Sequence, residues 1–154
     1  MPLTPALGCP APDFQLQSQH GEHVSLSSFR GEKAVAVMFF PFAFSRTCTG
    51  ELRDVRDGLS GLAQASVELV TVSCDPMFTL RAFAEAEHLS FPLLSDFWPH
   101  GEVARRYAVF DEQRGCASRG TFVVDRHGLL CWKVENSMSH ARNWSATRQA
   151  LSRL

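Results

Sequence analysis

The side chain best placed for chemistry is the thiol of Cys48, which follows an apolar segment and a loop that contains Pro41 and Ser45. We predict that a helix begins in this loop, with Ser45 as its N-cap residue. The first turn of a helix presents unpaired N–H groups and a partial positive charge, which stabilise a thiolate over a thiol. Cys48 is therefore a candidate nucleophile, although an isolated half-buried cysteine at a helix start is more often only a small apolar side chain.

The segment that begins at Cys48 has the spacing of an amphipathic helix. Its apolar residues fall on one stripe and its charged residues on the opposite face. The stripe consists of Cys48, Leu52, Val55, Leu59 and Leu62. Cys48 thus lies on the core-facing side of the first turn. We expect Pro41 to end the preceding strand, and Phe42 and Phe44 to shield the sulfur from water.

The remaining elements alternate between strands and helices. The continuous apolar run 34–40 is typical of a strand buried on both faces, the segment 67–73 repeats the buried-strand pattern, and the Cys48 helix lies between them. The order strand, helix, strand predicts a parallel pair. We also predict a hairpin over 14–17 and 24–26, helices over 79–87, 101–107 and 144–154, a short edge strand or loop at 91–92, and a hairpin over 121–125 and 129–134.

These elements form the outline of a thioredoxin-like α/β fold, with a central mixed β-sheet flanked by helices and an N-terminal β-hairpin extension. With 154 residues and no linker or internal repeat, the chain predicts a single domain over 1–154. In open α/β sheets, ligand chemistry gathers at the carboxyl ends of parallel strands. Cys48 and Cys74 both follow such strands, so the fold and the helix argument indicate the same region.

Composition excludes several classes of function. A formal net charge of -1 gives no basic face for nucleic acid, and no apolar run is long enough to cross a membrane. The first residues do not resemble an export signal, so we expect a cytoplasmic protein. Five widely spaced cysteines cannot all pair, and reduced thiols are expected. The Cys and His spacings are not those of a metal site, and we expect neither a metal nor a cofactor.

Together these residues resemble the peroxiredoxins, a family of cysteine-based peroxidases. The family's PxxxTxxC loop is present here as Pro41, Ser45 and Cys48, with a serine that keeps the hydroxyl of the more common threonine. Further stretches are similar to the AhpE-type, one-cysteine branch, and the resemblance runs in order over most of the chain. Gly50-Glu51-Leu52 follow the loop. The AhpE-type stretches are Ala11-Pro12-Asp13-Phe14, 91–101 (FPLLSDFWPHG) and 119–125 (RGTFVVD).

The resemblance implies a thiol-dependent peroxidase that reduces hydrogen peroxide and organic hydroperoxides. Cys48 would be the peroxidatic nucleophile and would form a sulfenic acid, with the Arg119 guanidinium beside its sulfur. The Ser45 hydroxyl would orient the peroxide, and Pro41 would protect the sulfenic acid from further oxidation. Glu51 would help to hold the arginine, although a solvated acid in the first helical turn is an equally good interpretation of the sequence.

Aromatic residues are expected at the substrate mouth. Phe42 and Phe44 would offer an apolar wall that favours organic peroxides. Trp98 belongs to the aromatic stretch 97–100, which is also a candidate for a subunit contact or for a loop that packs on the core. The resemblance further implies a homodimer.

The sulfenic acid must be reduced again, and the sequence favours an external thiol for this step. Relatives that resolve within the same helix carry a second cysteine where this chain has Arg53. Thioredoxin, a glutaredoxin or mycoredoxin, or a low-molecular-weight thiol would then attack the oxidised Cys48. Cys74 is the main internal competitor, but a disulfide requires Cα atoms within about 7 Å of each other. The weaker candidates are Cys116, Cys9 and Cys131, the last of which is expected to pack beneath a helix.

Two alternatives remain open. A thiol–disulfide oxidoreductase would normally carry a CxxC motif, but Cys48 is followed by Thr49-Gly50-Glu51. The alternative from another class is a non-enzymatic thioredoxin-fold protein that acts in binding, as a chaperone or as a redox sensor. Such a protein would consume peroxide no faster than free cysteine.

Overall fold

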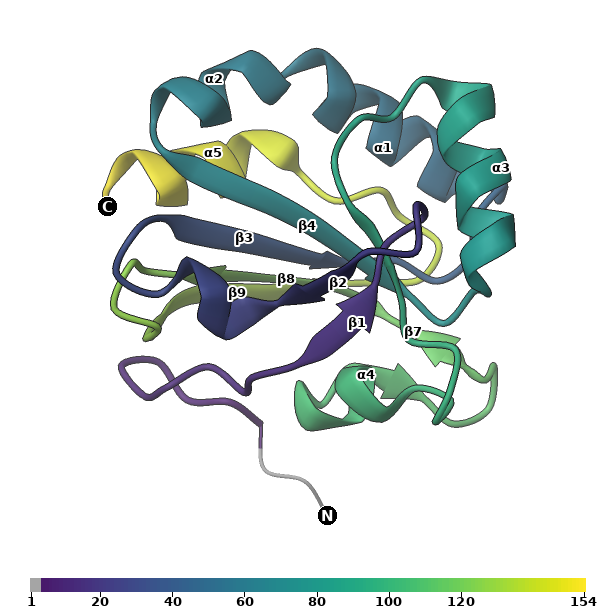
Figure 1. The fold of residues 1–154 in the computed structure, drawn as a ribbon, viewed down its shortest axis with the longest axis horizontal. Coiled ribbons are helices and arrows are strands. Elements are labelled where there is room, and N and C mark those ends of the chain that lie inside the picture. Colours follow the sequence, from purple (N-terminus) through teal and green to yellow (C-terminus); the bar gives the residue numbers. More distant parts are fainter. Residues whose placement is uncertain (1–3) are drawn as a thin grey trace.

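The computed structural model describes residues 4–154, which contain a seven-stranded sheet and a two-stranded sheet. The strands of the large sheet are β1 Gln15–Gln17, β2 His23–Ser25, β3 Ala34–Phe39, β4 Val67–Ser73, β5 Leu93–Ser95, β8 Arg119–Val124 and β9 Leu130–Asn136, and those of the small sheet are β6 Phe110–Asp111 and β7 Cys116–Ala117. In space, the large sheet has the order β2-β1-β5-β4-β3-β8-β9 (Figure 1).

The centre of the large sheet is parallel and its two edges are antiparallel. β3 pairs with β4 and β4 with β5 in parallel, whereas β8 pairs antiparallel with both β3 and β9. At the other edge, β1 pairs antiparallel with β5 through Gln17 and Ser95, and it forms a hairpin with β2. The predicted parallel pair and both predicted hairpins are therefore confirmed.

Helices cover both faces of this sheet. They are α1 Arg46–Asp57, α2 Leu59–Gln64, α3 Met77–Glu87, α4 Glu102–Arg106 and α5 Trp144–Ser152, with a 3-10 turn η1 at Leu26–Phe29. Figure 1 shows α1, α2, α3 and α5 on one face and α4 on the other. None of the helices in residues 4–154 combines the length and the apolar character needed to span a membrane.

The central strand β3 shows why both faces must be covered. All six of its residues are buried, and alternate side chains join opposite core clusters. Ala36 and Met38 belong to the cluster that includes residues of α1 and α3, whereas Val37 and Phe39 belong to the other cluster. A strand buried in this way needs a continuous apolar sequence, which is the pattern from which it was predicted.

Two parts of the sheet differ from the prediction. The third parallel strand, β5, begins at Leu93, just after the predicted edge or loop at 91–92, and it lies inside the sheet because β1 pairs with its outer side. The hairpin of β6 and β7 is not predicted. Its strands have two residues each, which is too short for a periodic hydrophobic pattern.

The helix predicted from the Cys48 stripe is interrupted at Gly58. This glycine ends α1, and α2 begins at the next residue. A Cβ atom at Gly58 would lie 2.9 Å from Nε1 of Trp144, the first residue of α5. Only a glycine therefore allows α5 to pack this closely against the break between the two helices.

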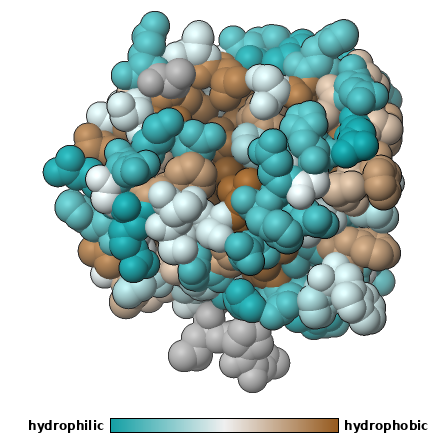
Figure 2. Space-filling view, viewed as in Figure 1, coloured by the Kyte–Doolittle hydropathy of each residue, from teal (hydrophilic) through white to brown (hydrophobic). Residues whose placement is uncertain are grey.

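Most of the exposed large apolar side chains lie at one end of the sheet. Phe42 and Phe44 follow β3, Phe78 lies in the first turn of the helix that follows β4, and Phe97 and Trp98 follow β5. Because parallel strands have their carboxyl ends at the same end of a sheet, these five side chains lie at that end. Figure 2 shows hydrophobic residues exposed among hydrophilic ones. Some of them lie on the right of the view, where Figure 1 shows α3.

Candidate active site

Cys48 is the third residue of α1 and is fully buried. Its backbone N–H donates to the Ser45 hydroxyl at 3.3 Å, so Ser45 is the N-cap residue that the sequence predicts. The Ser45 carbonyl also accepts from the Thr49 hydroxyl at 2.7 Å. The first turn of α1 is thus closed by two side-chain hydrogen bonds, and it presents the sulfur of Cys48 to the protein interior.

Arg119 lies directly beside the sulfur. Its Nη1 donates to Cys48 Sγ at 3.3 Å and also to Oε1 of Glu51, and its Nε donates to the Met138 carbonyl at 3.0 Å. Arg119 is the first residue of β8, which runs antiparallel to β3 and therefore begins at the end of the sheet where β3 stops. The sheet topology thus brings Arg119 next to Cys48, although the two residues are far apart in the sequence.

Glu51 is the buried carboxylate that holds this arrangement. It is only 3% exposed, and its two oxygens accept from different arginines, Arg119 and Arg142. The interpretation of Glu51 as a solvated first-turn acid is therefore wrong. Two positive charges against one negative charge leave one positive charge in excess beside Cys48. A thiolate at Cys48 would complete the charge balance.

Arg142 is the site residue that the sequence analysis does not find. Its backbone N–H and its Nε donate to Oε2 of Glu51 at 2.7 and 2.9 Å, and its Nη1 donates to the Thr121 hydroxyl at 2.9 Å. Its Nη2 donates to the carbonyl of Phe39, the last residue of β3. Burial lowers the pKa of Arg142, and the Glu51 carboxylate opposes this shift. In the sequence, Arg142 stands in a polar segment without periodicity, which by itself indicates only a surface charge.

The residues expected around the sulfur differ in their burial. Pro41, the second residue after β3, is buried, whereas Phe42 is 43%, Phe44 is 54% and Trp98 is 82% exposed. The Phe44 ring packs against Phe83 of α3, with 5.1 Å between the ring centroids. Phe42 and Phe44 are thus only partly buried, and their expected shielding of the sulfur stays a prediction. The sulfur is enclosed within the core cluster on the α1 side of the sheet.

The five cysteines are all free thiols. Burial, and then the nearby Asp96 carboxylate, raise the pKa of Cys74 to about 12, and burial raises the pKa of Cys116 to about 11. Both are therefore protonated and weakly nucleophilic at neutral pH. Cys131 does not pack beneath a helix as expected. It is exposed on the edge strand β9, where its S–H donates to the Val123 carbonyl at 3.3 Å.

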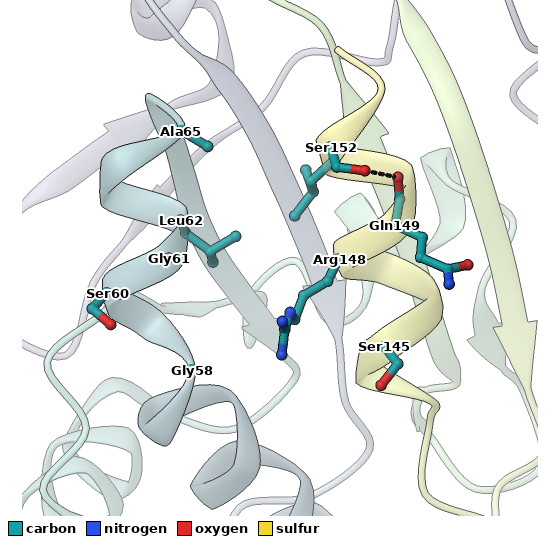
Figure 3. A pocket seen from close by; sticks show the side chains of 10 residues that line it. Gly58, Ser60, Gly61, Leu62, Ala65, Ser145, Arg148, Gln149 and Ser152 are labelled. Carbon is teal, nitrogen blue, oxygen red and sulfur yellow. Dashed lines mark hydrogen bonds between the residues drawn. The ribbon is translucent and has the colours of Figure 1, made fainter.

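A large cavity lies away from this site. It has a volume of about 620 Å³ and opens between α2 and α5, where the Arg148 side chain extends toward the other helix (Figure 3). Its lining residues include neither Cys48 nor any of the residues that contact its sulfur or Glu51. The cavity is thus separate from the buried polar network at the end of β3.

The chain is similar to known proteins in both sequence and structure. The AhpC/TSA family matches residues 7–133. Alkyl hydroperoxide reductase E from Mycobacterium tuberculosis is 42% identical over 149 residues, which cover 95% of this chain and 97% of that protein. Enterococcus faecalis AhpC superposes with a TM-score of 0.88 at 27% identity, covering 97% of this chain and 92% of that one.

A second solved structure, peroxidoxin BcpB from Mycobacterium tuberculosis, has a TM-score of 0.82 at 29% identity, with 96% and 95% of the two chains covered. These likenesses confirm the thioredoxin-like fold expected from the order of the elements. They also agree with the family expected from the Pro41, Ser45 and Cys48 loop. The chain therefore belongs to the AhpC/TSA family, the peroxiredoxins, and is similar to its AhpE-type branch.

Proposed function

We propose that this chain, a thiol-dependent peroxidase of the AhpC/TSA family, reduces hydrogen peroxide and organic hydroperoxides through Cys48. The observation that carries the proposal is the Arg119 guanidinium at 3.3 Å from Cys48 Sγ, within a buried group of charges that has one positive charge in excess. Such a setting stabilises the thiolate that must attack the peroxide. The non-enzymatic alternative, binding, chaperone or redox-sensor activity, is not favoured by the family match.

In the reaction, the thiolate attacks one peroxide oxygen and the O–O bond breaks. The sulfur becomes a sulfenic acid, and the other oxygen leaves as an alcohol or as water after taking up a proton. Arg119 would stabilise the charge that grows on the leaving oxygen, and each charge-assisted hydrogen bond contributes about 1.5–3 kcal/mol. The Ser45 hydroxyl would orient the peroxide, and buried Pro41 would limit access to the sulfenic acid.

An external thiol would return Cys48 to its reduced form. A first thiol would form a mixed disulfide with Cys48 and release water, and a second would release the reduced cysteine. The raised pKa values of Cys74 and Cys116 support this proposal, because both thiols are protonated at neutral pH and are therefore poor internal nucleophiles. Thioredoxin, a glutaredoxin or mycoredoxin, and low-molecular-weight thiols are the proposed classes of reductant.

The proposal extends to assembly, organisation and location. The five exposed aromatic side chains that follow the parallel strands support the proposals of a homodimer and of a substrate mouth that includes Phe42, Phe44 and Trp98. One sheet with core clusters on both faces supports a single domain over 1–154. Free thiols at all five cysteines are in keeping with a cytoplasmic protein.

Stopped-flow mixing of the reduced protein with peroxide tests the proposal. The wild type should consume peroxide rapidly, Cys48→Ser should not, and Cys74→Ser should retain the wild-type rate as the matched control. Counting the remaining thiols after one equivalent of peroxide tests the recycling step, since an internal disulfide would remove two thiols per chain. A wild type that consumed peroxide no faster than free cysteine would refute the enzymatic proposal.

A further inference from the structure

The loop that leads into α1 contains a strained residue. Phe44 has a φ of 68°, in the left-handed region that aromatic residues rarely adopt. The turn is closed by the Ser45 N–H, which donates to the Phe42 carbonyl at 3.3 Å. Phe44 immediately precedes the N-cap residue. If it relaxed to a negative φ, Ser45 would leave the position from which its hydroxyl reaches the Cys48 N–H.

Asp75 provides a charged acceptor for this loop. Its Oδ2 accepts from the Ala43 N–H at 2.9 Å and from the Ser73 hydroxyl at 2.7 Å. A hydrogen bond between a carboxylate and a backbone N–H is stronger than one between neutral groups. The Ala43 N–H lies one residue before Phe44, so this bond acts directly on the strained turn.

Asp75 is itself fixed to the rigid sheet. Its backbone N–H donates to the Ser73 hydroxyl at 3.3 Å, and its carbonyl accepts from the Ser95 hydroxyl at 2.7 Å. Ser73 and Ser95 are the last residues of β4 and β5 and pair with each other in the sheet. Asp75 therefore connects the loop to the carboxyl ends of two adjacent strands, while Phe83 supports the Phe44 ring from α3.

We propose that Asp75 is a positioning residue for peroxide reduction. Its carboxylate holds the left-handed turn at Phe44 and thereby keeps Ser45 and Cys48 in their reactive arrangement. Asp75 acts through the Ala43 N–H, since its side-chain hydrogen bonds in the described chain go to Ala43 and Ser73. The inference rests on the proposed role of Cys48 and adds a residue that is outside the PxxxTxxC loop.

The test compares Asp75→Ala with a matched control, Asp125→Ala. The Asp125 carboxylate also holds a turn, accepting from the N–H groups of His127 and Leu129 at 2.9 and 3.0 Å, but at the opposite end of β8. Asp75→Ala should lower the second-order rate constant for Cys48 oxidation about tenfold or more, and Asp125→Ala should leave it unchanged. Asp75→Asn keeps an oxygen acceptor for the Ala43 N–H and should restore most of the rate.

Circular dichroism distinguishes positioning from a general loss of structure. The spectrum of Asp75→Ala should match that of the wild type, while its rate constant for Cys48 oxidation falls. Ser73→Ala, which removes one bond that orients the carboxylate, is a milder variant and should slow oxidation less than Asp75→Ala.

The inference would be overturned by a wild-type rate in both Asp75→Ala and Ser73→Ala. Equal slowing of Asp75→Ala and Asp125→Ala, or a loss of the wild-type circular dichroism spectrum in Asp75→Ala, would also overturn it. These results would leave the proposed function intact. A wild type no faster than free cysteine would instead refute the proposed function, and this inference with it.

Discussion

The Glu51 carboxylate and the Arg142 guanidinium meet at 2.9 Å in the protein interior, although 91 residues separate them in the chain. The same carboxylate accepts from Arg119, which in turn donates to the sulfur of Cys48. Arg142 thus orients the acid, the acid orients Arg119, and Arg119 contacts the sulfur. Removing Arg142 and removing Arg119 should therefore have different measurable consequences.

Replacing Arg142 by methionine should destabilise the protein substantially. The variant keeps most of the side-chain length but leaves the buried Glu51 carboxylate with a single cationic partner. Breaking a buried ion pair on one side costs about 3–5 kcal/mol, and we expect a loss of this size in the free energy of unfolding measured with urea. Arg53→Met, which removes an exposed ion pair with Glu87, is the matched control and should change little. Equal losses in the two variants would contradict the role of the buried pair.

Replacing Arg119 by alanine should slow peroxide reduction about ten- to a hundredfold. The reason is the loss of a charge-assisted hydrogen bond worth about 1.5–3 kcal/mol at the sulfur and the leaving oxygen. Stopped-flow kinetics measures the rate constant, and circular dichroism verifies that the variant is folded. Arg119→Lys keeps the charge without the planar guanidinium group, and its rate constant should lie between those of the wild type and Arg119→Ala. An alanine variant that reacted like the wild type would remove Arg119 from the mechanism.

Replacing Ser45 by alanine should weaken the start of α1. The variant loses the hydroxyl that accepts from the Cys48 N–H, and an N-cap of this kind contributes about 1 kcal/mol. Thermal unfolding should show this loss for Ser45→Ala but not for Ser45→Thr, which keeps the hydroxyl. Threonine should also retain the peroxidase rate, whereas alanine should reduce it. Equal impairment by both substitutions would indicate that the size of the side chain matters, and not its hydroxyl.

Alkaline pH should destabilise the protein through its buried thiols. Folding raises the pKa of Cys74 from 9.0 to about 12 and that of Cys116 from 9.0 to about 11, so the folded state keeps protons that the unfolded chain releases. This difference has no effect below pH 9.0, and stability falls as the pH rises from 9.0 toward 12. Urea midpoints measured on both sides of pH 9.0 test this. Cys74→Ala should show a shallower decline, and an unchanged slope would assign the effect to other groups.

Local sequence patterns account for the elements and for the start of the site. The strand over 67–73 has the predicted bounds because a segment rich in apolar and β-branched residues indicates a strand without distant information. The N-cap at Ser45 is likewise a short-range property, since its hydroxyl bonds an N–H three residues along the chain. The strand β5 is different. It has three residues, and its place inside the sheet depends on β1, which comes from the N-terminal part of the chain.

The sequence by itself determined which sulfur is the candidate nucleophile, because an apolar strand, a proline loop and a helix N-cap are local features around Cys48 and because this loop resembles that of the peroxiredoxins. Only the tertiary structure decided what surrounds that sulfur. The burial of Glu51, the recruitment of Arg142 and the exposure of Phe42 and Phe44 follow from how β8, the segment before α5 and α3 pack around α1. Contacts between residues distant in the chain leave no periodic trace in the sequence, since they depend on the register of strands and on the charges that a closed interior can balance.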